Sequence, residues 1–149
     1  MSAPGPQRLD PARCRGLLGE RGVGRVVFTQ DALPAVATLN YAVAGGALHF
    51  RTAAGTAVAR CVGDAVVAFN VDAEGTDGPG AGWSVTVTGR CRREEPGEDV
   101  RRALDVWAPG PREEFFAVDL ALLEGFALDG GRAARDARTR PGGAVPPVG

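Results

Sequence analysis

The stretch of the chain best suited to bind an anion lies between positions 48 and 62, where it reads LHFRTAAGTAVARCV. Alternating residues predict a short strand, small residues form a loop, and Thr56 stands at the N-cap position of a short helix over residues 57–61. A strand that runs through such a loop into a helix N-terminus presents free backbone N–H groups to a phosphate.

Side chains around this loop would add to the site. Arg51 and Thr52 end the predicted strand, and Arg60 lies within the helix, so two positive charges flank the loop. The same pattern also fits an ordinary strand–turn–helix connection whose caps serve only stability. Both interpretations remain open from this segment alone.

Composition narrows the classes of function. The 149 residues suffice for one domain with a hydrophobic core, and a net charge of −1 gives no argument for nucleic-acid binding. All seventeen basic residues are arginines, so chemistry that depends on lysine is excluded. The single histidine, His49, excludes a His-rich metal site and an HExxH site.

The cysteine spacing, the hydrophobic segments and the acidic loop do not indicate secretion or metal binding. The three cysteines are scattered and form no CxxC pair, which is typical of reduced thiols in a cytosolic protein. We expect a cytoplasmic protein, since no membrane span or signal peptide is recognisable. The acidic loop over residues 72–81 lacks the spacing of an EF-hand and is expected to be a solvated turn.

Hydrophobic periodicity predicts a mainly β chain with two or three short helices. Residues 65–71 are nearly continuously apolar and predict a strand covered on both faces, whereas Trp83 begins the cleanest alternating strand. Val100, Ala103, Leu104 and Trp107 form one helical stripe, so Trp107 is expected in the core. The expected elements are a loose N-terminus at 1–9, helices at 10–18, 57–61 and 98–107, strands at 24–29, 34–43, 47–52, 65–71, 82–93 and 114–123 with 125–128 extending the sheet, and a disordered tail at 130–149.

Six antiparallel strands of this spacing favour a small closed or partly closed barrel. No GxGxxG motif follows a strand and no βαβ alternation is present, which argues against a doubly wound sheet. We therefore expect a single domain over residues 10–129.

Several segments in the same order resemble the pyridoxamine 5′-phosphate oxidase-like family, especially its small actinobacterial-type members. They are GRVVFTQDALPAVATLNYAV, LHFRTAAGT, AVVAFNVDA, GWSVTVTGR and WAPGPRE. The resemblance covers roughly residues 9–125. It implies a six-stranded antiparallel split β-barrel with Greek-key connections, which binds FMN between the two subunits of a homodimer.

The resemblance also implies which residues contact the flavin. One strand offers backbone groups to the ring, the Arg-Thr pair and the following helix take the phosphate, and the partner subunit closes the pocket. The implied ring contacts are Val36, Thr38, Leu39, Asn40 and Tyr41, the phosphate contacts are Arg51, Thr52, Thr56 and Arg60, and the residues that close the pocket are Trp83 and Ser84.

One departure from the family lies at Ala57, where the family usually carries a lysine after the Gly-Thr pair. Loss of that lysine would remove a charge-assisted contact of about 1.5–3 kcal/mol. Arg60 shares the helix face and, with Arg51, would compensate. Alternatively, the site is weakened, and the protein binds FMN poorly or holds another ligand.

The resemblance thus implies an FMN-dependent oxidoreductase with a small-molecule substrate, in which the flavin carries the electrons and no protein nucleophile is required. The alternatives are a non-catalytic carrier of flavin or haem, and a reductase that uses the deazaflavin F420. His49 is interpreted as a surface strand residue or a haem ligand. Tyr41 is expected to line the pocket or cap the barrel, and Trp83 to cover a flavin or pack in an interface.

Overall fold

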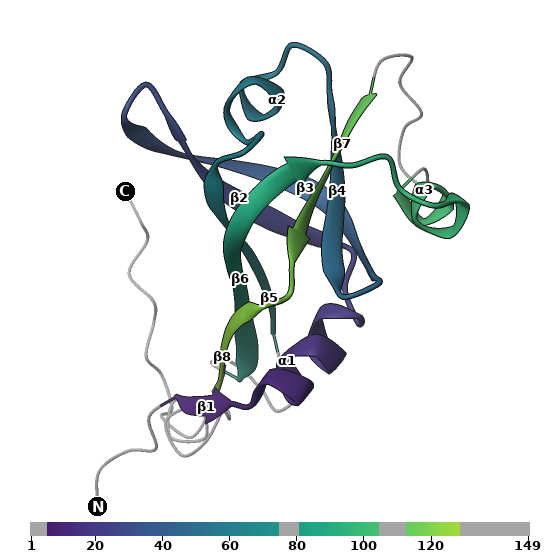
Figure 1. The fold of residues 1–149 in the computed structure, drawn as a ribbon. Coiled ribbons are helices and arrows are strands. Elements are labelled where there is room, and N and C mark those ends of the chain that lie inside the picture. The colour runs from purple at the N-terminus through teal and green to yellow at the C-terminus, as the bar shows by residue number, and fades with distance from the viewer. Residues whose placement is uncertain (1–5, 75–80, 105–112, 129–149) are drawn as a thin grey trace, which may run out of the picture.

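The computed structural model describes residues 6–74, 81–104 and 113–128. Within these ranges the chain forms eight strands and three helices (Figure 1). Their order is β1 (Gln7–Leu9), α1 (Pro11–Leu18), β2 (Val23–Gln30), β3 (Leu33–Ala44), β4 (Ala47–Ala53), α2 (Ala57–Cys61), β5 (Val66–Glu74), β6 (Gly82–Arg93), α3 (Glu98–Leu104), β7 (Glu113–Asp119) and β8 (Leu122–Leu128). None of the described helices has the length and apolar character needed to cross a membrane.

Six of the strands close into an antiparallel barrel, in the order β6-β5-β2-β3-β4-β7 and back to β6. The long strand β6 makes this closure possible because its partners change along its length. Its first part pairs with β8 through Gly82–Thr88, and its last residues, Cys91–Arg93, pair with β7. Strand β1 adds to the outer edge of β8. The predicted mainly β, six-stranded antiparallel barrel is confirmed.

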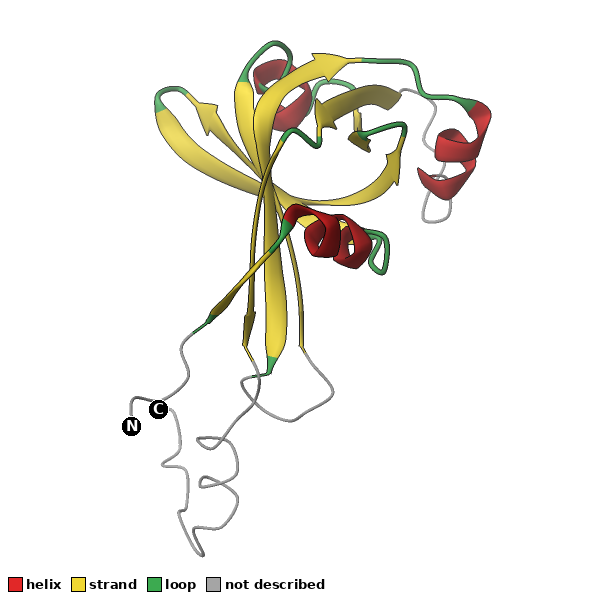
Figure 2. Ribbon diagram, turned by 60° about the horizontal axis from the view of Figure 1, so that its bottom comes forward, coloured by secondary structure: helices red, strands yellow, loops and turns green. Residues whose placement is uncertain are grey.

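Helices α1 and α2 lie at opposite ends of the barrel, and α3 lies to one side of it (Figures 1 and 2). The N-cap of α1 is Asp10, whose carboxylate accepts a hydrogen bond from Arg13 N at 2.7 Å, and Pro11 occupies the first turn. Leu17 and Leu18 of this helix are buried in the core and cover one end of the barrel.

Aromatic rings fill the centre of the barrel. The ring centroids of Phe50 and Phe69, and of Phe50 and Phe116, are each 5.6 Å apart. Tyr41 meets Phe69 edge to face at 5.4 Å. All four residues come from alternate positions of β3, β4, β5 and β7 that point inward, and burial of each ring stabilises the fold by about 1.5–3 kcal/mol.

The prediction of a single last strand over residues 114–123 is wrong in one respect, because this segment belongs to two strands. Strand β7 ends at Asp119 and a two-residue turn leads into β8. This turn contains no glycine or proline, so the sequence gives no signal of it. Tertiary contacts hold it instead: Leu120 is buried and its N–H donates to Gly46 O at 2.9 Å.

Other expectations also differ from the structure. The predicted strand at residues 65–71 is covered on one face only within this chain, and Val66 is 64% exposed. Gln7–Leu9, expected to be loose, pairs with β8. Asp72 and Glu74 belong to β5 rather than to a loop, and Ala103 is exposed although it was placed on the apolar stripe of α3. Trp107 and the predicted tail at 130–149 lie outside the described residues.

Candidate functional site

Strands β3 and β4 separate after a short stretch of pairing and leave a gap in the barrel wall. They pair only through Tyr41–Ala44 of β3 and Ala47–Phe50 of β4. Residues 33–40 of β3 continue along β2 instead, with a register from Gln30↔Leu33 to Val23↔Asn40. We refer to the diverging segments, residues 36–40 of β3 and 51–53 of β4, as the fork.

The backbone of β3 exposes polar groups at the fork. Tyr41 N donates to Gly22 O at 2.9 Å, so the N–H of residue 41 points toward β2. Successive residues of a strand point their N–H and C=O groups to alternate edges, and Val36, Thr38 and Asn40 therefore point theirs away from β2. Pro34, which has no N–H, has the same orientation, as expected for an open strand edge.

A pocket of about 450 Å³ occupies the fork. Five of the residues predicted to contact the flavin line it, together with three further described residues. The predicted residues are Thr38, Leu39, Asn40, Arg51 and Thr52, and the others are Val23, Ala53 and Glu113. The structure thus brings together two groups of candidates that the sequence placed more than ten residues apart.

Arg51 carries a close ion pair inside this pocket. Its Nη1 lies 2.7 Å from Glu113 Oε2, and the two side chains are 8% and 16% exposed. The pair follows from the register of β4 and β7, which sets Ala53 opposite Glu113. Sequence analysis missed Glu113, because it lies 62 residues from Arg51 and only the pairing of β7 with β4 brings it to the fork.

A network of hydroxyl groups joins the fork to helix α2. Thr56 is the N-cap: its Oγ1 accepts from Ala59 N at 3.2 Å and donates to Ala53 O at 2.9 Å. Thr52 Oγ1 lies 2.8 Å from Thr56 Oγ1. Since Thr56 gives its single hydroxyl proton to Ala53, Thr52 donates to Thr56.

Arg60 does not line the fork pocket. Its guanidinium donates to Gly55 O at 2.6 Å, and it borders a separate depression with Arg92 and Arg93. The expected compensation for the missing lysine at position 57 therefore has no support in this arrangement.

Two of the predicted ring contacts point into the core. Leu39 packs against the barrel core, and Tyr41 is buried with its hydroxyl donating to Leu18 O at 2.6 Å. Burial raises the pKa of Tyr41 to about 12. Tyr41 therefore holds β3 against α1, and neither its side chain nor its N–H points into the fork.

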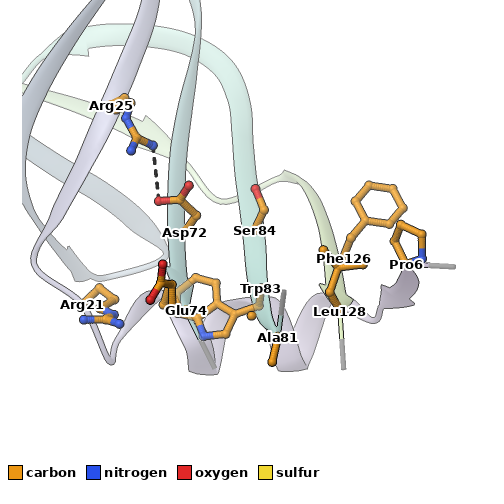
Figure 3. Close-up of a pocket in the computed structure, with 12 residues that line it drawn as sticks. Pro6, Arg21, Arg25, Asp72, Glu74, Ala81, Trp83, Ser84, Phe126 and Leu128 are labelled. Atoms are coloured by element: carbon orange, nitrogen blue, oxygen red, sulfur yellow. Dashed lines mark hydrogen bonds and ion pairs between the residues drawn. The ribbon is translucent and has the colours of Figure 1, made fainter. Parts of the chain in front are cut away.

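Trp83 and Ser84 line a second, larger pocket of about 920 Å³, shown in Figure 3. Arg25 and Asp72 form an ion pair at its wall, 3.3 Å apart, and Asn70 Nδ2 donates to Ser84 Oγ at 2.9 Å. A third pocket of about 330 Å³ shares Arg21, Arg25 and Asp72 with the larger pocket and Val23 and Thr38 with the fork pocket. The three pockets adjoin one another through these shared residues, and we call them together the groove.

Comparison with known proteins identifies the family. The family model of pyridoxamine 5′-phosphate oxidase matches residues 10–125. This chain belongs to the pyridoxamine 5′-phosphate oxidase family. An uncharacterised protein of Mycobacterium tuberculosis is 30% identical over 92% of this chain and 99% of its own length.

Solved structures share the fold of this family member. An FAD-binding protein of Mycobacterium smegmatis is 24% identical, with a TM-score of 0.65 over 83% of this chain and 98% of its own. A haem-binding protein of the same organism is 17% identical, with a TM-score of 0.62 over 81% of this chain and 59% of its own. At these identities the similarity is one of fold.

In this member of the pyridoxamine 5′-phosphate oxidase family, His49 is buried, so its interpretation as a surface residue is wrong. It alternates with Leu48 and Phe50 on β4, but its side chain is only 9% exposed. Its Nε2 lies 3.3 Å from Ala44 O, and its Nδ1 has no partner among the described residues. His49 lines none of the three pockets of the groove.

Proposed function

We propose that this chain binds FMN in the fork and acts as a flavin-dependent oxidoreductase on a small-molecule substrate. The observation that carries the proposal is the open edge of β3, whose residues 38–40 line a pocket that also contains Arg51, with Val36 further along the same edge. The pyrimidine edge of a flavin ring carries alternating donors and acceptors, and main-chain N–H and C=O groups of Val36, Thr38 and Asn40 complement such an edge. The residues of the fork therefore fit a flavin ring.

The phosphate end of the ligand would meet Arg51 and Thr52, with Thr56 fixing the loop behind them. Arg51 is a suitable group because a guanidinium binds phosphate oxygens in a bidentate manner. Arg60 would contribute only by giving up its bond to Gly55 O. The FAD-binding relative from Mycobacterium smegmatis supports a flavin as the ligand class.

A second copy of the chain is part of this proposal. One row of outward-facing residues crosses five strands through consecutive pairings: Val36, Val27, Ala68, Thr88 and Leu122. Val36 and Leu122 are 61% and 64% exposed, which is unusual for large aliphatic side chains in one continuous row. A partner covering this face would bring its Trp83 and Ser84 toward the fork of the first chain.

When bound, the flavin supplies the redox chemistry, and the protein binds and orients it. The main chain of β3 would fix the ring, Arg51 and Thr52 the phosphate, and the partner copy would exclude water. No side chain of the fork is required as a nucleophile. A non-catalytic flavin carrier would use the same pocket, and F420 would occupy it as another ligand of flavin-like shape. Haem has less support, because His49 is outside the groove.

The proposal is tested by titrating the purified protein with FMN, F420 and haemin, and by a pair of substitutions at one position. Thr38→Pro removes an N–H that points into the fork and leaves the β2 pairing intact, since residue 38 points away from β2. Thr38→Ala keeps this N–H and is the matched control. We expect flavin affinity to fall about tenfold in Thr38→Pro and to stay near wild type in Thr38→Ala.

Assays with nitro, quinone and pyridoxine-type acceptors then separate the enzyme from a carrier. Turnover of reduced flavin by any of these acceptors supports the oxidoreductase. Tight flavin binding without electron transfer to any of them would instead support the carrier. Uptake of F420 or haemin in place of FMN would reject FMN as the cofactor.

A further inference from the structure

We infer that Glu113 is a specificity-determining residue of the fork: it neutralises Arg51 and makes the pocket nearly indifferent to the phosphate of a flavin. The inference rests on the proposed flavin site and refines it. It concerns which form of flavin the site prefers, not whether a flavin binds there.

The charges lining the pocket support this inference. Among the eight described residues that line it, Arg51 is the one cation and Glu113 the one anion, and their side chains lie 2.7 Å apart. Both are largely buried, so water screens their mutual attraction, and the repulsion between Glu113 and an incoming anion, much less than at an exposed surface. A phosphate dianion that approaches Arg51 must therefore displace or share a carboxylate partner already in place.

Among the described residues, the loop between β4 and α2 supplies no further positive charge to the pocket. Position 57 is alanine, and Arg60 donates to Gly55 O and lines a separate depression, not the fork pocket. Thr52 donates its hydroxyl proton to Thr56. The fork therefore attracts a phosphate less strongly than a guanidinium without a neighbouring carboxylate would.

The main chain of Glu113 is fixed beside the fork by strand pairing, so its carboxylate can leave Arg51 only by rotation of the side chain. Glu113 begins β7, and the register from Ala53↔Glu113 to Ala47↔Asp119 pairs this strand with β4 along its whole length. The neighbouring carboxylate Glu114 points to the other face of β7 and pairs with Arg93 at 2.8 Å. Glu114 thus provides a control of equal charge that lies outside the pocket.

The experiment compares riboflavin with FMN, which differ only in the phosphate. Each is titrated into wild type, Glu113→Gln and Glu114→Gln, with circular dichroism to verify the fold. In wild type, the two flavins should bind with dissociation constants within about threefold of one another. Glu113→Gln should tighten FMN about tenfold or more and leave riboflavin unchanged, and Glu114→Gln should change neither.

The wild-type comparison alone can overturn the inference, even where Glu113→Gln does not fold. A preference of wild type for FMN over riboflavin by about a hundredfold or more would show that the phosphate is strongly recognised despite Glu113. Unchanged FMN affinity in a folded Glu113→Gln variant would also overturn it. In both cases the flavin site stands, whereas failure of every protein to bind either flavin would reject the proposed function and this inference with it.

Discussion

Thr52 and Thr56 are joined by a hydrogen bond of 2.8 Å between their hydroxyl oxygens, which ties the end of β4 to the N-cap of α2. Thr56 thereby closes three contacts at once: with Thr52, with Ala53 O and with Ala59 N. The loop that carries Gly55, whose φ is 82°, is held between these bonds. The wall of the fork is therefore anchored by a single side chain.

Replacing Thr56 with alanine should destabilise the protein by about 1–2 kcal/mol, because the helix loses its N-cap and Thr52 loses its acceptor. Thr56→Ser keeps the hydroxyl and should retain most of this stability. Urea unfolding followed by circular dichroism measures both. Equal stability of the alanine and serine variants would show that the hydroxyl network contributes nothing.

Gly24 should not tolerate a side chain. A Cβ at this position would contact the ring of Phe69 and lie 2.8 Å from Asn70 O, both on the neighbouring strand β5. We expect Gly24→Ala to cost about 1–3 kcal/mol, because the backbone of β5 cannot yield without breaking its pairing. Gly22→Ala, where no atom lies within 4 Å, is the control and should change stability by less than about 0.5 kcal/mol. Comparable losses in the two variants would contradict the close approach of β2 to β5.

Because of Tyr41, the free energy of unfolding should decrease as the pH rises into the alkaline range. Its folded-state pKa, about 12, lies above the ordinary value of 10.0 because burial disfavours the phenolate. The stability that the buried, neutral Tyr41 contributes is therefore fully present below pH 10. Between pH 10 and 12 this tyrosine ionises in the unfolded state but not in the folded state, so the free energy of unfolding falls by about 1.4 kcal/mol per pH unit.

Comparison with Tyr41→Phe isolates this contribution. At neutral pH the variant should be less stable than wild type by about 1 kcal/mol, since Leu18 O loses its donor. The difference should shrink and then reverse between pH 10 and 12. Cys91, whose pKa burial also raises to about 12, is present in both proteins and cancels. A constant difference across this range would contradict the burial of Tyr41.

The three thiols should differ sharply in reactivity. Cys14 and Cys91 are fully buried and burial raises the pKa of each, whereas Cys61 on α2 is partly exposed. A disulfide reagent should modify one thiol of the native protein rapidly and the other two only on unfolding. Cys61→Ser should abolish the rapid phase. Rapid modification of two or more thiols would mean that the barrel ends are open.

Local sequence patterns predicted most of the barrel because alternation and capping are local properties. Asp10 and Thr56 start their helices as expected, and the glycine pair at 45–46 forms a hairpin turn with φ of 60° and 75°. The turn after Asp119 was missed since it is set by the burial of Leu120 rather than by turn residues.

The candidate site was predictable only in part. Thr38, Asn40, Arg51 and Thr52 meet in the fork because β3 leaves β4, and this depends on which strands pair, not on either segment alone. Glu113 became visible only through the β4–β7 register. His49 alternates like a surface residue, and only the three-dimensional structure shows that it is buried.

The most direct test of the flavin site is a map of backbone amide chemical shifts during titration with riboflavin, in a sample labelled with ¹⁵N. We predict the largest changes at the amides of Val36, Thr38 and Asn40, with smaller ones at residues 51–53 on the opposite side of the fork. Shifts confined to the pocket around Trp83 and Phe126, with those of the fork unchanged, would contradict the account and place the ligand elsewhere on the barrel.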